Sequence, residues 1–153
     1  MKAGSKAPDF SARTADGQQI QLSQFLGQRG LVLFFYPKDG TRICTAEACA
    51  FRDSYEKFVD AGFEVIGISS DSQISHQQFA ERNALPFPLI SDSDGALRKL
   101  FNVPRTLGLL PGRVTYVIDR DGIIRHIYSA ALASDNHVTE ALDAISHGSP
   151  QGE

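Results

Sequence analysis

Residues 31–49 read LVLFFYPKDGTRICTAEAC, an apolar run followed by a turn-forming segment and the only two cysteines of the chain, Cys44 and Cys49. The run, 31–36, has the length and composition of a buried strand. The residues after it predict a helix with Thr41 as its N-cap, which makes Cys44 the third helical residue. Unpaired backbone N–H groups and the positive end of the helix dipole favour a thiolate at that position over a thiol. The sequence therefore predicts redox chemistry at sulfur.

The remainder of the chain alternates between strand and helix patterns. Apolar runs bounded by turn residues predict further strands at 64–69, 88–91, 113–119 and 123–129. The dipeptide Asp121-Gly122 joins the last two as a hairpin. Apolar residues at steps of three and four predict helices within 48–59, 74–80, 95–101 and 136–146. Strands that alternate with helices imply parallel crossovers. We expect an α/β fold of thioredoxin type, a mixed central sheet with a parallel core, a C-terminal antiparallel hairpin, and helices on both faces.

Composition is that of one soluble globular domain. The chain has 153 residues, 42% of them hydrophobic and 22% charged, which predicts a single domain over 1–153 with a frayed tail at 147–153. The net charge is -3 and the 15 basic residues are scattered, which gives no reason to expect nucleic acid as a partner. The sequence lacks both a membrane-spanning apolar segment and an apolar secretory signal, so we expect a cytoplasmic protein without membrane partners.

The spacing of the two cysteines constrains their chemistry. Five residues along an ideal helix separate two Cα atoms by about 8.6 Å. A disulfide tolerates at most about 6.8 Å. Cys44 and Cys49 therefore cannot join while the helix start is intact, and a bond between them requires the first turn or two to unwind. The terminal turn is the easiest part of a helix to open. We expect the reduced and oxidised forms to differ in helix content around 42–51.

The same segment carries a family motif. Pro37, Thr41 and Cys44 stand in the pattern Pro-x-x-x-Thr-x-x-Cys, with Cys49 five positions later. This pattern resembles the active site of the peroxiredoxins, specifically the Q-type or bacterioferritin-comigratory-protein subfamily.

Other parts of the chain agree with this resemblance, which runs nearly from end to end. Residues 4–10, GSKAPDF, are similar to the opening of that family. Residues 112–119, GRVTYVID, are similar to the strand that bears its active-site arginine, here Arg113. The chain departs from the Q-type pattern in having Arg42-Ile43 where members commonly carry Pro-Gly. We expect this departure to alter loop stiffness, the peroxide pocket and the ease of helix opening.

The resemblance implies a thiol-specific peroxidase acting on hydrogen peroxide and organic hydroperoxides. It makes Cys44 the peroxidatic cysteine, which becomes a sulfenic acid, and Cys49 the resolving cysteine, which forms an intramolecular disulfide with it. It assigns Pro37 to shielding the thiolate, Thr41 to a hydroxyl hydrogen bond, and Arg113 to steadying the sulfur and the peroxide. The implied reductant is thioredoxin or a similar donor, the implied state is a monomer, and no metal or other cofactor is implied.

Other interpretations of the same residues stay open at this point. Two buried cysteines can be inert packing. A thiol-disulfide oxidoreductase is a second enzymatic alternative, although that chemistry generally uses Cys-x-x-Cys. A peroxide-responsive redox sensor is a third. Glu47 either assists a hydrogen-bond network or complements the helix dipole. The four histidines are expected at the surface, and the loop 103–112 either lines the substrate entrance, docks a reductase, or simply packs.

Overall fold

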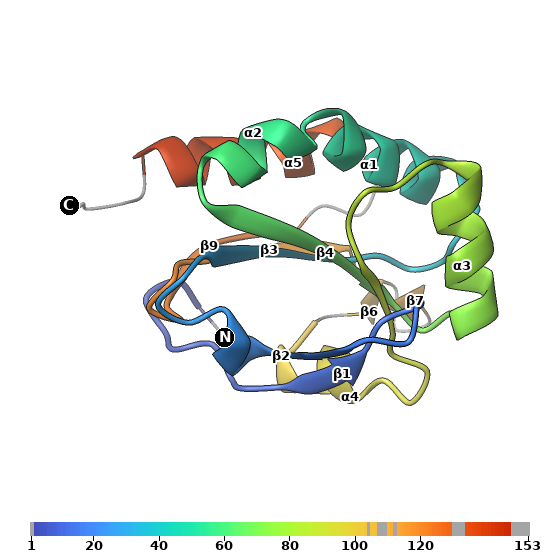
Figure 1. Cartoon of the computed structure of the whole chain (residues 1–153), viewed down its shortest axis with the longest axis horizontal. Helices are drawn as coiled ribbons and strands as arrows, with labels where there is room; N and C mark the ends of the chain where they lie inside the picture. The colour runs from blue at the N-terminus through green and yellow to red at the C-terminus, as the bar shows by residue number, and fades with distance from the viewer. Residues whose placement is uncertain (1, 104, 107–109, 112, 130–133, 148–153) are drawn as a thin grey trace.

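A computed structural model describes residues 2–103, 105–106, 110–111, 113–129 and 134–147 (Figure 1). Its centre is a five-stranded sheet in the order β5-β4-β3-β8-β9. Strands β3, β4 and β5 run parallel, and β3, β8 and β9 are successively antiparallel. The strands are β3 (Gly30–Phe35), β4 (Phe63–Ser69), β5 (Leu89–Ser91), β8 (Val114–Ile118) and β9 (Ile124–Ser129). This confirms the predicted mixed sheet with a parallel core and a C-terminal hairpin.

Helices cover both faces of the sheet (Figure 1). On one face lie α1 (Arg42–Asp53), α2 (Tyr55–Asp60) and α5 (Ser134–His147), with α3 (Gln73–Arg82) beside the loop that leads into α1. The other face carries α4 (Ala96–Leu100), the hairpin β1 (Ser11–Arg13) and β2 (Gln19–Gln21), and the 3₁₀ turn η1 (Leu22–Gln24). A short pair, β6 (Arg105–Thr106) with β7 (Leu110–Pro111), completes the described elements.

Strand β3 divides the core into two layers. Val32 and Phe34 pack toward the helices, in a cluster that includes Cys44. Leu33 and Phe35 pack toward α4 and the β1–β2 hairpin. A strand buried on both faces is a continuous apolar run rather than an alternating one, which is why 31–36 is so apolar. The loop that follows β3 is thereby held at the end of a rigid strand.

Three features differ from the sequence-based expectations. The helix predicted within 48–59 is broken at Ser54, which adopts φ -103 and ψ 5 between α1 and α2. Strands β1 and β2 were not expected, because each is three residues long and mostly exposed. The expectation that all histidines lie at the surface is wrong for His76 and His137, both of which are fully buried. Half of the loop 103–112, namely 104, 107–109 and 112, and the tail beyond 147 lie outside the described residues.

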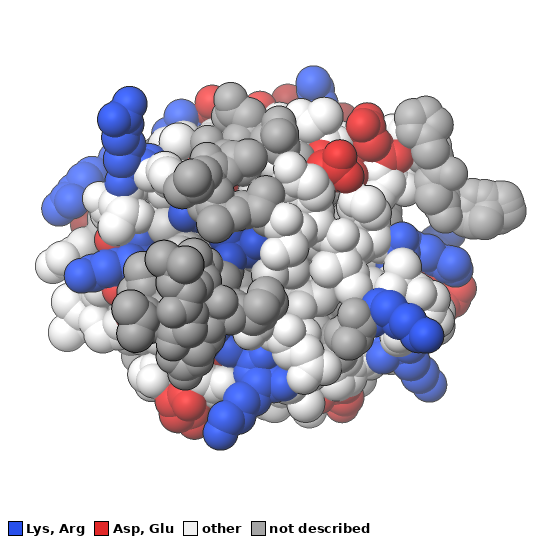
Figure 2. All heavy atoms as spheres, turned by 180° about the vertical axis from the view of Figure 1, so that it is seen from behind, with Lys and Arg blue, Asp and Glu red and all other residues white. Residues whose placement is uncertain are grey.

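Charge on the surface is mixed. On the face turned away from the viewer in Figure 1, basic and acidic side chains lie around the margin, and the described part of the middle is mainly uncharged (Figure 2). None of the helices described is both long enough and apolar enough to cross a membrane.

Candidate active site

The loop between β3 and α1 presents Cys44 at the start of the helix. Gly40 has φ +76, a left-handed conformation that glycine adopts without a Cβ penalty. Thr41 follows in extended geometry as the N-cap of α1, and Cys44 is the third helical residue, as predicted from the sequence. The Cys44 side chain is only 1% exposed. The thiol therefore lies at the first turn of a helix, shielded from bulk water.

The sheet brings Arg113 to this thiol from 69 positions away in the chain. Arg113 immediately precedes β8, which pairs antiparallel with β3 so that Val114 lies opposite Phe35. Its guanidinium donates through Nη2 to Cys44 Sγ at 3.2 Å and through Nη1 to a carboxylate oxygen of Glu47. Glu47 lies three residues after Cys44, so both side chains are on the same face of α1. One buried guanidinium thus contacts two acidic groups.

The charges of this cluster are linked. Burial raises the pKa of Glu47 to about 8, although the adjacent Arg113 charge acts in the opposite direction. Burial alone would lower the pKa of Arg113, but Glu47 and Cys44 together raise it above its ordinary value. A single guanidinium charge balances one anion. A proton held on Glu47 therefore leaves the Arg113 charge available to a thiolate on Cys44.

A second layer of polar groups surrounds Glu47. His137 of α5 is fully buried, with Nδ1 2.8 Å from the Thr115 hydroxyl and 3.6 Å from Glu47 Oε2. Its ring packs edge-on against Tyr128. Sequence reasoning missed His137, because an isolated histidine on a helix carries no signal of its own. For Glu47, the hydrogen-bond network is the interpretation that the structure confirms.

The other predicted site residues lie nearby with different partners. Pro37 is half-buried, and Thr41 is exposed with its hydroxyl donating to the Lys38 carbonyl oxygen at 3.0 Å. Cys49 is half-buried, and its thiol faces Asn83 Oδ1 at 3.7 Å. Both cysteines are free thiols. The structure therefore joins Arg113 directly to Cys44, places Pro37 and Thr41 in the adjoining loop, and turns Cys49 toward the end of α3.

Comparisons with known proteins identify the same family along most of the chain. Residues 3–127 match the AhpC/TSA family. The chain is 50% identical over 146 residues to chloroplastic peroxiredoxin Q of Oryza sativa subsp. japonica, which covers 95% of this chain and 67% of that protein. It is 47% identical over 143 residues to chloroplastic peroxiredoxin Q of Arabidopsis thaliana, which covers 93% of this chain and 66% of that protein.

Solved structures agree. The peroxidoxin BcpB of Mycobacterium tuberculosis superposes with a TM-score of 0.88 at 36% identity, over 95% of this chain and 97% of that one. The bacterioferritin comigratory protein of Xanthomonas campestris, whose structure was described for its alkyl peroxide reduction activity, superposes with a TM-score of 0.84 at 29% identity, over 95% of this chain and 98% of that one.

The comparisons also correct one expectation. A cytoplasmic location was expected from the sequence, and it is wrong by this evidence, because the matched peroxiredoxin Q proteins of rice, wheat and Arabidopsis are named chloroplastic. The expectation rested on the lack of an apolar secretory signal and of a membrane span, and neither feature bears on location in a plastid.

The buried Cys44–Arg113 pair and the end-to-end similarity point to one conclusion. The chain belongs to the AhpC/TSA family and is a thiol peroxidase of the peroxiredoxin Q group.

Proposed function

We propose that Cys44 is the peroxidatic cysteine of this enzyme and that Cys49 is its resolving cysteine. The observation that carries the first assignment is the 3.2 Å contact between Arg113 Nη2 and Cys44 Sγ in a buried site. A thiolate there attacks one oxygen of a peroxide. An S–O bond forms and the O–O bond breaks, so that sulfur is oxidised to sulfenic acid and the leaving oxygen takes a proton to become water or an alcohol.

Thiol ionisation alone does not make a peroxidase. An unperturbed thiol is about 3% ionised at pH 7, so complete ionisation raises the reactive fraction only about thirtyfold. Preorganised donors that stabilise charge on a leaving oxygen contribute about 100- to 1,000-fold each in other enzymes. Arg113 supplies such a donor beside Cys44. We assign the Thr41 hydroxyl and the Cys44 backbone N–H as further donors, and Pro37 as the side chain that shields the thiolate.

The second half of the cycle involves Cys49. Its thiol condenses with the sulfenic acid on Cys44, an S–S bond forms, and water leaves. A dithiol donor then reduces the disulfide and is itself oxidised. We propose thioredoxin or a related protein as that donor, hydrogen peroxide and organic hydroperoxides as substrates, and a monomer as the working state. Both cysteines lie in one intact helix, Arg42–Asp53, so the disulfide step requires that part of α1 unwinds.

A thioredoxin-coupled peroxide assay tests these roles. The wild type is expected to consume many equivalents of peroxide. Cys44→Ser is expected to abolish reaction with peroxide, because the remaining thiol, Cys49, faces Asn83 and has no contact like that of Cys44 with Arg113. Cys49→Ser is expected to allow one oxidation of Cys44 and then to stop or to recycle slowly. Full turnover by Cys44→Ser would refute the assignment.

A further inference from the structure

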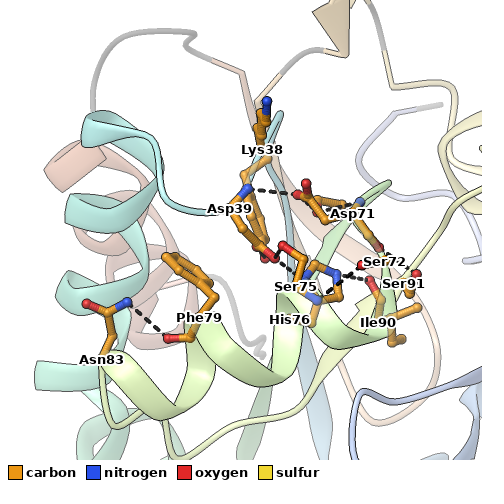
Figure 3. A network of polar contacts seen from close by, with 12 residues as sticks. Lys38, Asp39, Asp71, Ser72, Ser75, His76, Phe79, Asn83, Ile90 and Ser91 are labelled. Atoms are coloured by element: carbon orange, nitrogen blue, oxygen red, sulfur yellow. Dashed lines mark hydrogen bonds and ion pairs between the residues drawn. The ribbon is translucent and has the colours of Figure 1, made fainter.

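A second polar cluster lies at the carboxyl ends of the parallel strands β3, β4 and β5, apart from the residues assigned above. It is built on Asp39, Asp71 and His76, whose polar atoms lie within 4.8 Å of one another (Figure 3). Such a trio resembles a cation site. However, the Oδ2 atoms of both carboxylates and both ring nitrogens are already engaged by protein partners. This arrangement favours a role for the cluster in holding the chain.

Asp39 is the centre of this cluster. Its carboxylate accepts hydrogen bonds from the Tyr36 hydroxyl at 2.5 Å and from the Ser75 hydroxyl at 2.9 Å, and His76 Nδ1 lies 2.6 Å from Oδ2. Its backbone N–H donates to Asp71 Oδ2 at 2.7 Å. Burial, followed by the Asp39 charge, raises the pKa of Tyr36 well above its ordinary value, so the tyrosine hydroxyl keeps its proton and donates.

These contacts fix the orientation of the His76 ring. Nε2 lies 2.9 Å from the carbonyl oxygen of Ile90, which only accepts hydrogen bonds. Nδ1 faces a carboxylate that also acts as an acceptor toward Tyr36 and Ser75. The ring is fully buried, and the contacts of its two nitrogens with Asp39 and Ile90 hold it in one orientation.

The position of Asp39 in the chain connects its contact with His76 to the site. Asp39 lies two residues before the N-cap Thr41 and five before Cys44. Its side chain contacts His76 and Ser75 of α3, and its backbone N–H donates to Asp71 after the end of β4. His76 in turn contacts the carbonyl oxygen of Ile90 in β5. The loop that carries the start of α1 is therefore anchored to three other elements.

We propose that His76 is a positioning residue whose buried contact with Asp39 anchors the loop before α1, so that it holds the Cys44 pocket in shape and restrains the unwinding that brings Cys44 to Cys49. This proposal rests on the proposed function of the two cysteines. It makes His76 act on both halves of the cycle in opposite directions. The anchor favours attack on peroxide, which needs the folded pocket, and disfavours disulfide formation, which needs the opened helix.

The anchor also sets how long the sulfenic acid persists. While α1 stays folded, a second peroxide can oxidise the sulfenate to a sulfinate, in which a new S–O bond forms and the O–O bond of that peroxide breaks to release water or an alcohol. Disulfide formation removes the sulfenic acid before this occurs. Weakening the anchor is therefore expected to lower the yield of sulfinic acid at a given excess of peroxide.

The test separates the two steps in single-turnover experiments with hydrogen peroxide, quenched with an alkylating reagent and analysed by mass spectrometry. Oxidation of Cys44 is timed in a Cys49→Ser background, and disulfide formation is timed with both cysteines present. His76→Phe and Asp39→Asn are each expected to slow Cys44 oxidation at least about tenfold, since small misplacements of reacting groups cost up to about 100-fold. Both are expected to speed disulfide formation, and the double variant is expected to match either single one.

Two control variants distinguish positioning from loss of stability. His126→Gln removes a different histidine–carboxylate pair, that with Glu140 at 2.7 Å on the partly exposed surface, and is expected to leave both rates unchanged. Phe101→Leu weakens the core layer on the opposite face of the sheet and lowers overall stability without touching the anchor. Its disulfide formation is expected to stay close to that of the wild type. Equal effects of Phe101→Leu and His76→Phe on both rates would overturn the proposal.

A separate measurement tests the anchor even if the cysteine assignments fail. If peroxide leaves Cys44 of the wild type unoxidised, the proposed function is wrong, and the state of His76 is then read directly by ¹⁵N NMR of the histidine rings. A ¹⁵N shift of His76 Nδ1 that changes between the wild type and Asp39→Asn supports the anchor. The same Nδ1 shift in both proteins overturns it.

Discussion

Replacing Ala46 with glycine is expected to speed formation of the proposed Cys44–Cys49 disulfide about fivefold. Ala46 lies between the two cysteines in α1, and its side chain is exposed, so the substitution removes no core contact. Glycine in a helix interior costs about 1 kcal/mol relative to alanine, because the unwound chain gains more conformational freedom. With RT of about 0.6 kcal/mol, that difference multiplies the population of the unwound state about fivefold.

The assay starts from the sulfenic acid. One equivalent of hydrogen peroxide is added to the reduced protein, samples are quenched at successive times, and the disulfide is quantified by mass spectrometry. The matched control is Lys57→Gly, which places the same glycine penalty at an exposed position of α2, outside the segment that must unwind. Lys57→Gly is expected to form the disulfide at the rate of the wild type.

The reasoning fails if Ala46→Gly and Lys57→Gly form the disulfide at the same rate. That result would mean that the two sulfurs meet without opening α1, in spite of their separation along the helix. Amide exchange supplies an independent check. Residues 42–51 are expected to lose protection in the oxidised protein, and equal protection in the two forms would contradict the same step.

Three further predictions concern the site and its loop. Arg113→Ala and Thr41→Val are each expected to lower the second-order rate constant for reaction with hydrogen peroxide more than about thirtyfold. A decrease of that size exceeds what the loss of thiol ionisation alone can cause. Near-normal rate constants in stopped-flow assays would refute these donor roles. Burial raises the pKa of Glu47 from 4.5 to about 8, so the folded state keeps a proton that the unfolded state releases. Wild-type stability is therefore expected to fall as the pH rises from 4.5 to 8, by at most about 1.4 kcal/mol per pH unit, and Glu47→Gln is expected to lack this fall. Stability profiles from urea denaturation that stay parallel for the two proteins over this pH range would contradict the prediction. Gly40→Ala is expected to destabilise the protein by about 1–2 kcal/mol, because alanine is strained in the left-handed backbone conformation of this position. The strain is the whole effect, since a Cβ at this position meets no heavy atom within 4 Å. An unchanged midpoint of urea denaturation would argue against that conformation.

Much of the sheet was predictable because its central strands are buried on both faces. Phe34 and Phe35 point in opposite directions from β3 and are both almost fully buried, so the whole run had to be apolar and was easy to recognise. The β1–β2 hairpin left no such pattern. Its strands are short and Ile20 is the only residue of β2 that faces the core, which leaves too little periodicity to distinguish it from a loop.

The site was predictable where chemistry depends on local spacing. The position of Cys44 at the third residue of α1 follows from the loop and its N-cap, and the structure confirms it. The partners of that thiol were less accessible to sequence reasoning. Arg113 was identified through family resemblance, and its contact with Glu47 depends on the register of β8 against β3. The burial of His76 and His137 is a product of tertiary packing, and a lone histidine in sequence does not reveal it.

The 69-residue separation between Cys44 and Arg113 ties chemistry to the completion of folding. During synthesis, β3 and α1 emerge well before β8, so a nascent chain that has formed the first part of the sheet holds a cysteine without its cation. Only when β8 docks against β3 does the guanidinium arrive. The peroxide reactivity proposed for Cys44 is thus acquired only once β8 has docked, and the fraction of Cys44 that reacts is expected to report how much of a population has reached that stage.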